Sequence, residues 1–174
     1  MIQIINEDAI MMSLHPWWIY QMALGKKTWE IRSRMPKVDL PCKVYLYCTK
    51  SFGKATDAQI QEMFNSNFAV ASWSGRVVAS FVIDKTEKFH IMLDARASEC
   101  IKVVCNDISV EKDCCVPKQD LYEYIGTCRP GYALHISEFQ MLPTLQNYEA
   151  FAVKTAPQYY CKVNKGIKIE KNDV

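Results

Sequence analysis

The chain has 174 residues, of which 49% are hydrophobic and 23% are charged, and its formal net charge is +2. This length suits one folded domain with a substantial core, and only six glycines and seven prolines exclude a disordered or fibrous chain. Apolar runs fall short of the roughly 18 residues that span a bilayer. Residues 1–12 carry two acids and no basic residue, so we predict a cytoplasmic protein with no secretory signal and no membrane contact.

Short elements are predicted in the first part of the chain. The apolar run 9–14 predicts a strand, and Pro16 opens a helix that ends at Gly25, because proline suits the first helical turn and glycine suits the turn after a helix. Apolar and polar side chains alternate over 28–34, and this period of two predicts a strand with one polar face. A further strand is predicted over 43–50.

The middle of the chain is predicted to hold two insertions, at 51–72 and 92–116. The first contains a helical segment that Thr56 or Asp57 would cap. The second shows no clear periodicity and receives no assignment. Between them, 75–91 gives the longest strand pattern in the sequence.

The last part of the chain is predicted to return to short elements. Residues 118–126 predict a helix, and the strand pattern that follows is expected to stop at Pro143. Residues 157–163 predict a final strand, and the polar tail over 165–174 is expected to fray.

Strands dominate these predictions, and no regular β-α-β alternation appears. We therefore predict a mixed α/β (α+β), mainly β fold, as a small β-barrel or strongly curved sheet with short helices across its openings. A single domain is predicted over 1–164, since no repeat or linker divides it.

Cysteines and charges are unevenly placed. No two cysteines form a CxxC pair, so we predict free thiols and neither a metal site nor another cofactor. Residues 25–54 hold eight basic residues against two acids, 84–123 hold six against nine, and 154–171 hold five against one. Basic segments suit a phosphate-bearing partner, although a solvated surface would also give them. The eight cysteines stand at 42, 48, 100, 105, 114, 115, 128 and 161.

The most informative segment is GKKTWEIR, at 25–32. Gly25 allows a sharp turn from helix to strand, and Lys27 lies at that turn. Glu30 and Arg32 point to one face, because strand side chains alternate. A lysine, a carboxylate and a guanidinium gathered at one mouth of the fold could bind a phosphate or a nucleobase edge. The alternative is a local ion pair with the lysines in solvent.

The segment GKKTWEIR matches the GxKxxExR signature of the ASCH (activating signal cointegrator homology) domain of the PUA-like superfamily. The segments PWWIYQMALG, KVYLYCTK, GRVVASFVID, QDLYEYIG, YALHISEF and PQYYCKV, in this order, also resemble bacterial and phage members. The resemblance implies a PUA-like β-barrel and a cleft that binds RNA or a modified nucleobase. Lys27, Glu30 and Arg32 would line this cleft, Thr28 would stand among them, and Gly25 would shape the turn.

An enzymatic branch with a related fold, the acetylcytidine amidohydrolases, is similar around the same turn. Its lysine corresponds to Lys27, but its threonine falls where this chain has Glu30, and Thr28 stands two residues away. Its catalytic glutamate would fall near Glu111 and Asp113. In an enzyme, the resemblance makes Lys27 and Glu30 the expected catalytic residues.

Three functions remain as hypotheses. The first is binding of RNA or of a modified nucleobase or nucleotide, with exposed Trp18 and Tyr47 stacking on bases. The second is hydrolysis of an acylated cytidine or of RNA, with Lys27 as the key residue. The third is a phage-type protein–protein adaptor. The predicted ligand-binding residues are Lys27, Thr28, Glu30, Arg32, Trp18 and Tyr47.

Overall fold

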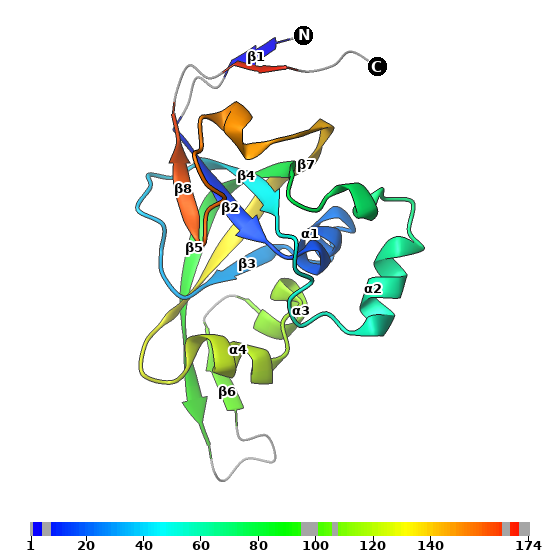
Figure 1. Ribbon diagram of the computed structural model, residues 1–174. Coiled ribbons are helices and arrows are strands. Elements are labelled where there is room, and N and C mark those ends of the chain that lie inside the picture. Colours follow the sequence, from blue (N-terminus) through cyan, green and yellow to red (C-terminus); the bar gives the residue numbers. More distant parts are fainter. Residues whose placement is uncertain (1, 5–7, 95–100, 106–107, 165–167, 171–174) are drawn as a thin grey trace.

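A computed structural model describes residues 2–4, 8–94, 101–105, 108–164 and 168–170, and a seven-stranded mixed sheet forms its centre (Figure 1). The hydrogen-bonded order is β3-β7-β5-β4-β2-β8, with β6 added to β5. Strands β2 and β4 are parallel, and the other neighbours are antiparallel. These strands are β2 (Ala9–Leu14), β3 (Trp29–Arg32), β4 (Cys42–Cys48), β5 (Val77–Leu93), β6 (Ile101–Val104), β7 (Gly131–Gln146) and β8 (Tyr160–Val163).

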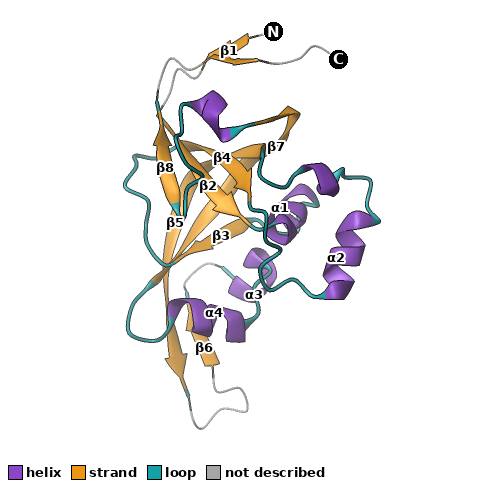
Figure 2. Cartoon of the chain, viewed as in Figure 1, coloured by secondary structure: helices purple, strands orange, loops and turns teal. Residues whose placement is uncertain are grey.

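Short helices flank the sheet, as Figure 2 shows. Helix α1 packs against α2, and α3 packs against β3. None of the helices in the described ranges is long and apolar enough to cross a bilayer. The helices are α1 (Pro16–Ala23), α2 (Asp57–Phe64), η1 (Val70–Ser72), α3 (Val110–Cys114), α4 (Lys118–Ile125) and η2 (Tyr148–Phe151).

Local signals in the sequence predicted most of these elements correctly. Pro16 is the first residue of α1, and Gly25 follows this helix with a φ of 69°. Of the two candidate caps of α2, Thr56 is the one used: its hydroxyl accepts from the Gln59 amide, and the Gln59 side chain accepts from Thr56 N–H. Gly126 ends α4 with a φ of 73°.

Two predictions about the second half of the chain need correction, and the elements of one unassigned segment can now be given. Strand β7 continues past Pro143 to Gln146, because its register with β5 shifts between the pairs Ala79–Met141 and Val77–Gln146, which leaves the proline outside the ladder. The unassigned segment 92–116 contains β6 and α3, while residues 95–100 and 106–107 lie outside the described ranges. The tail contributes β9 (Lys168–Glu170), which pairs with β1 (Ile2–Ile4) instead of fraying.

The expected barrel is not closed by backbone pairing. Strands β3 and β8 are the two ends of the described sheet order, and side chains bridge the gap between them. Arg32 Nη2 donates to the carbonyl of Ser13 on β2 at 3.1 Å, and the hydroxyls of Ser33 and Tyr159 lie 3.3 Å apart. Strands β3 and β8 have four residues each, and these pair with β7 and β2 instead of with each other.

The core consists of three apolar clusters, and the third one positions the site. It joins Trp29 and Ile31 of β3 to Phe89 of β5 and Leu121 of α4. This packing holds α3 and α4 over β3, so that their connecting segment faces α1. Trp29 is therefore buried.

Candidate functional site

The turn between α1 and β3 directs the signature lysine inward. The carbonyl of Gln21 accepts the amides of Lys26 and Lys27 at 3.0 and 3.1 Å, which wraps the chain around the end of α1. Thr28 N–H then donates to the carbonyl of Asp113 at 2.8 Å. Because these hydrogen bonds fix the turn to α1 and to Asp113, Lys27 is directed inward and is only 2% exposed.

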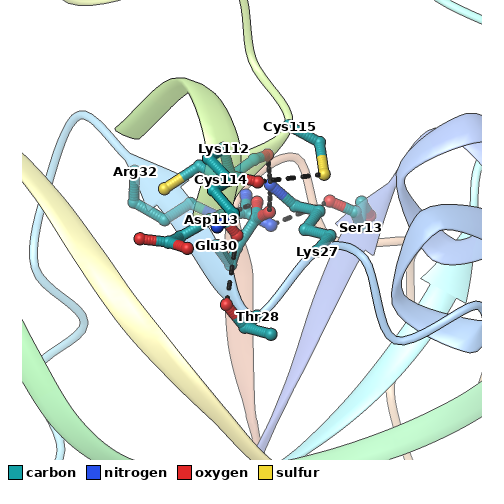
Figure 3. A network of polar contacts seen from close by, with 9 residues as sticks. All are labelled: Ser13, Lys27, Thr28, Glu30, Arg32, Lys112, Asp113, Cys114 and Cys115. Carbon is teal, nitrogen blue, oxygen red and sulfur yellow. Dashed lines mark hydrogen bonds and ion pairs between the residues drawn. The ribbon is translucent and has the colours of Figure 1, made fainter. Parts of the chain in front are cut away.

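Lys27, Glu30 and Arg32 form one buried ionic network, shown in Figure 3. Lys27 Nζ lies 3.2 Å from one carboxylate oxygen of Glu30, and Arg32 Nε lies 3.2 Å from the other. The Arg32 contact is an ion pair without hydrogen-bond alignment. Glu30 and Arg32 are 4% and 7% exposed, so the polar face of β3 is covered and not solvated.

Two further contacts fix Lys27. Its ammonium donates to the carbonyl of Cys114 at 2.7 Å and lies 5.2 Å from the centre of the Trp18 ring. Burial raises the pKa of the Cys114 thiol to about 12, although the charge of Lys27 opposes this rise. The thiol therefore stays protonated at neutral pH and is a poor nucleophile.

A cavity of about 920 Å³ opens above this network, between α1, the segment before α2, and α4. Its volume lies in the upper part of the range typical of small-molecule sites. Four aromatic rings contribute to its wall, from Trp17, Trp18, Phe52 and Tyr124. The charged residues in the lining are balanced, namely Lys27, Arg32 and Lys54 against Glu30, Asp120 and Glu123.

Gln21 and Arg32 each bring a buried nitrogen without a hydrogen-bond partner to this cavity, but Arg32 Nε is ion-paired with Glu30. The Gln21 side chain lines the cavity and is 5% exposed, and its Nε2 has no hydrogen-bond partner among the described residues. A buried donor without a partner costs about 1–3 kcal/mol. A bound acceptor would offset this cost.

The structure separates the predicted ligand-binding residues into two groups. Trp18, Lys27, Glu30 and Arg32 line the cavity, whereas Thr28 and Tyr47 do not. Tyr47 is 7% exposed and packs in the second core cluster, with its ring 5.7 Å from that of Tyr148, so its prediction as an exposed stacking residue is wrong. Thr28 precedes β3, so the alternation of the strand does not extend to it, and its hydroxyl lies 3.3 Å from the Asp113 carbonyl.

The two acids considered as a catalytic glutamate also lie away from the cavity. Glu111 is ion-paired with Lys118 at 3.5 Å, and Asp113 accepts the amide of Ser109 at 2.8 Å. Among the described residues, the carboxylates that line the cavity come from Glu30 and from α4. Glu111 and Asp113 are therefore not part of the cavity lining.

Sequence analysis missed several cavity residues. Gln21 stands three positions after Trp18, so helical spacing alone places both on one face of α1. The other missed residues belong to segments that only the tertiary fold brings close. Phe52 and Lys54 come from the segment between β4 and α2, and Tyr124 comes from α4.

Comparison with known proteins shows the fold. No model of a protein family matches the chain, and no curated protein is similar to it in sequence. Among solved structures, the chain is similar to ASCH from Zymomonas mobilis, with a TM-score of 0.60 and 16% identity over 90% of this chain and 88% of that one. For a Tyr-to-Phe variant of that protein, the TM-score is 0.58 and the identity 15%, over 90% of this chain and 91% of that one. For a Ser-to-Ala variant, the TM-score is 0.59 and the identity 16%, over 93% of this chain and 92% of that one.

These values define the class of the protein: a mainly β, α+β protein with an ASCH-like fold, as the signature GKKTWEIR predicted. Since 16% identity carries the fold and not the activity, the function is argued from the cavity itself.

Proposed function

We propose that the cavity above Lys27, Glu30 and Arg32 binds a nucleobase, presented by RNA or by a nucleotide or nucleoside. The observation that carries this proposal is the unpaired amide of Gln21, buried in a wall that also contains the Trp18 ring. A nucleobase offers ring nitrogen and carbonyl acceptors in a flat aromatic frame, which matches both features.

The shape and polarity of the wall support a flat aromatic ligand. Trp18, Phe52 and Tyr124 offer ring faces or edges, and stacking on such rings contributes about 1–3 kcal/mol per base. The ammonium of Lys27 lies over the Trp18 ring and adds a cation–π contact. The rings would stack on the faces of the base, and the Gln21 side chain would donate a hydrogen bond to an acceptor on its edge.

The charges of the floor favour a base over a phosphate. Glu30 contacts both Lys27 and Arg32, so much of their positive charge is already neutralised inside the protein. A phosphate at this floor would also lie near the Glu30 carboxylate. An uncharged base edge avoids that repulsion.

The test is calorimetric titration of the protein with nucleosides, including acetylated cytidine, and with short single-stranded RNA. Gln21→Met should weaken binding about three- to tenfold, because one hydrogen bond to the ligand is removed. The same change should raise the free energy of unfolding by about 1 kcal/mol, because it removes an unsatisfied donor. Trp18→Leu should weaken binding about tenfold or more. Gln61→Met, on the exposed side of α2, is the matched control and should change neither quantity.

Two results would contradict the proposal. Failure of every nucleoside and RNA to bind would leave the adaptor hypothesis. Release of acetate from acetylated cytidine, or shortening of the RNA, would support the hydrolase hypothesis if Lys27→Met abolished it in a folded protein.

A further inference from the structure

A second hollow of about 330 Å³ lies beside the cavity, between the segment that follows β3 and the start of β8. In Figure 1 the loop between β3 and β4 runs along β8. The Lys37 amide donates to the Tyr160 hydroxyl at 3.1 Å and fixes this loop in place. We call this hollow the Tyr159 groove; it is lined by Arg32, Arg34, Met35, Lys37, Tyr159 and Tyr160, with Met12 and Pro36 at its base.

The charge of the Tyr159 groove differs from that of the cavity. Arg34 and Lys37 line it beside Arg32, whose charge is paired with Glu30, and no carboxylate lines it among the described residues. Arg34 and Lys37 are exposed, so their charges are accessible to a ligand. An excess of positive charge without acids is the property that phosphodiester binding requires.

An exposed aromatic ring lies beside these cations. Tyr159 is 42% exposed, and its hydroxyl is held by that of Ser33 at 3.3 Å. The hydrogen bond with Ser33 lowers the pKa of Tyr159, against the effect of burial, and the charges of Arg34 and Arg129 lower it further. Basic residues therefore approach this ring from both the segment after β3 and the segment after α4.

The Tyr159 groove and the cavity are adjacent. Arg32 lines both of them, and Gln158 of the cavity wall is followed in the chain by Tyr159 of the groove. The two hollows therefore share Arg32 as a wall. A base-sized cavity lies on one side of this wall, and an aromatic ring with exposed cations lies on the other.

We propose that the Tyr159 groove is a second subsite, which binds the phosphodiester backbone and the neighbouring base of a single-stranded nucleic acid whose target nucleotide enters the cavity. This inference rests on the proposed function and specifies its ligand as a strand instead of a free nucleoside. Stacking on an exposed ring beside phosphate-binding cations is the way proteins hold single strands. A duplex must unpair and unstack a base before that base can enter the cavity, so a duplex should bind more weakly than a single strand.

The experiment measures fluorescence anisotropy of labelled, mixed-sequence RNA and DNA pentamers at several salt concentrations, with unlabelled nucleosides measured by calorimetry in parallel. The double variant Arg34→Gln with Lys37→Gln should weaken pentamer binding about tenfold and reduce the log–log salt slope by about 0.7 for each phosphate that the variant no longer neutralises. Tyr159→Leu should also weaken it, while Tyr159→Phe retains the ring and most of the affinity. Nucleoside affinity should not change in any of these variants.

The matched control is Lys88→Gln with Lys102→Gln, which removes the same charge from exposed positions on β5 and β6 that line neither hollow. Nucleoside binding with no gain for pentamers, or equal losses in the groove and control variants, would overturn the subsite and leave the proposed function intact. Tighter binding of a duplex would also overturn it. Absence of both nucleoside and pentamer binding would overturn the proposed function itself. Comparison of the affinities for the RNA and DNA pentamers shows whether the subsite prefers ribose or deoxyribose.

Discussion

Replacement of Glu30 should destabilise the protein more than replacement of either of its cationic partners. Glu30→Gln keeps the size of the side chain but leaves Lys27 and Arg32 as two buried cations without a carboxylate. At a separation of 3.2 Å and an effective dielectric constant of about 20, each attraction amounts to about 5 kcal/mol before desolvation is subtracted.

The net cost is smaller, because burying the carboxylate is itself unfavourable. Breaking a buried ion pair from one side typically costs about 3–5 kcal/mol, and we expect Glu30→Gln to fall in that range. Lys27→Met removes one pair and leaves Glu30 with Arg32. The Cys114 carbonyl also loses a donor, so we expect a cost of about 1–3 kcal/mol.

Equilibrium unfolding in urea, followed by tryptophan fluorescence and circular dichroism, measures these differences. The double variant Lys27→Met with Glu30→Gln should cost less than the sum of the two single variants, since the second change removes a charge that the first one left unpaired. A larger cost for Lys27→Met than for Glu30→Gln, or strict additivity, would refute the assignment of Glu30 as the shared partner.

Three other predictions concern groups around the site and the sheet. Cys115 lines the cavity and burial raises the pKa of its thiol, so iodoacetamide at pH 8 should modify exposed Cys128 first, and a bound nucleoside should slow only Cys115, as read by mass spectrometry. Burial opposes ionisation of Asp84, but the hydrogen bond and charge of His135 lower its pKa below the ordinary 3.8. Asp84→Asn should therefore lose stability above pH 4, and its difference from the unmodified protein should shrink as acid titration proceeds through the lowered pKa. Lys54 bridges to two carboxylates of α4 across the cavity mouth, so Lys54→Ala should speed both association and dissociation of a nucleoside in stopped-flow measurements without shifting the unfolding midpoint.

The parts of the fold that sequence predicted well are those with local causes. Pro16 and Gly25 delimit α1 through their own backbone preferences, and Thr56 caps α2 through contacts three residues away. The spacing of Lys27, Glu30 and Arg32 likewise follows from one turn and one strand, so these three residues could be placed together without knowledge of the rest.

The parts that failed depend on distant segments. Alternation along β4 predicts on which face of the sheet the Tyr47 side chain lies. Only the packing of η2 against that face decides that Tyr47 is buried. Pro143 is tolerated because the register between β5 and β7 shifts, which no local pattern reveals. The unpaired amide of Gln21 became visible only when every neighbouring acceptor had been placed.

The burial of the signature residues changes what the signature is expected to do. In sequence, Lys27 and Arg32 appear as two cations available to a phosphate, but in the fold Glu30 contacts both and the three are almost inaccessible. Phosphate recognition then falls to other cations, and Arg34 and Lys37 are the exposed ones that line the Tyr159 groove. Substitutions at Lys27, Glu30 and Arg32 should therefore alter stability and base binding with little effect on the salt slope, whereas substitutions at Arg34 and Lys37 should alter the salt slope with little effect on stability. Under this proposal, Lys27, Glu30 and Arg32 shape the base-binding cavity, and the Tyr159 groove binds the nucleic-acid backbone.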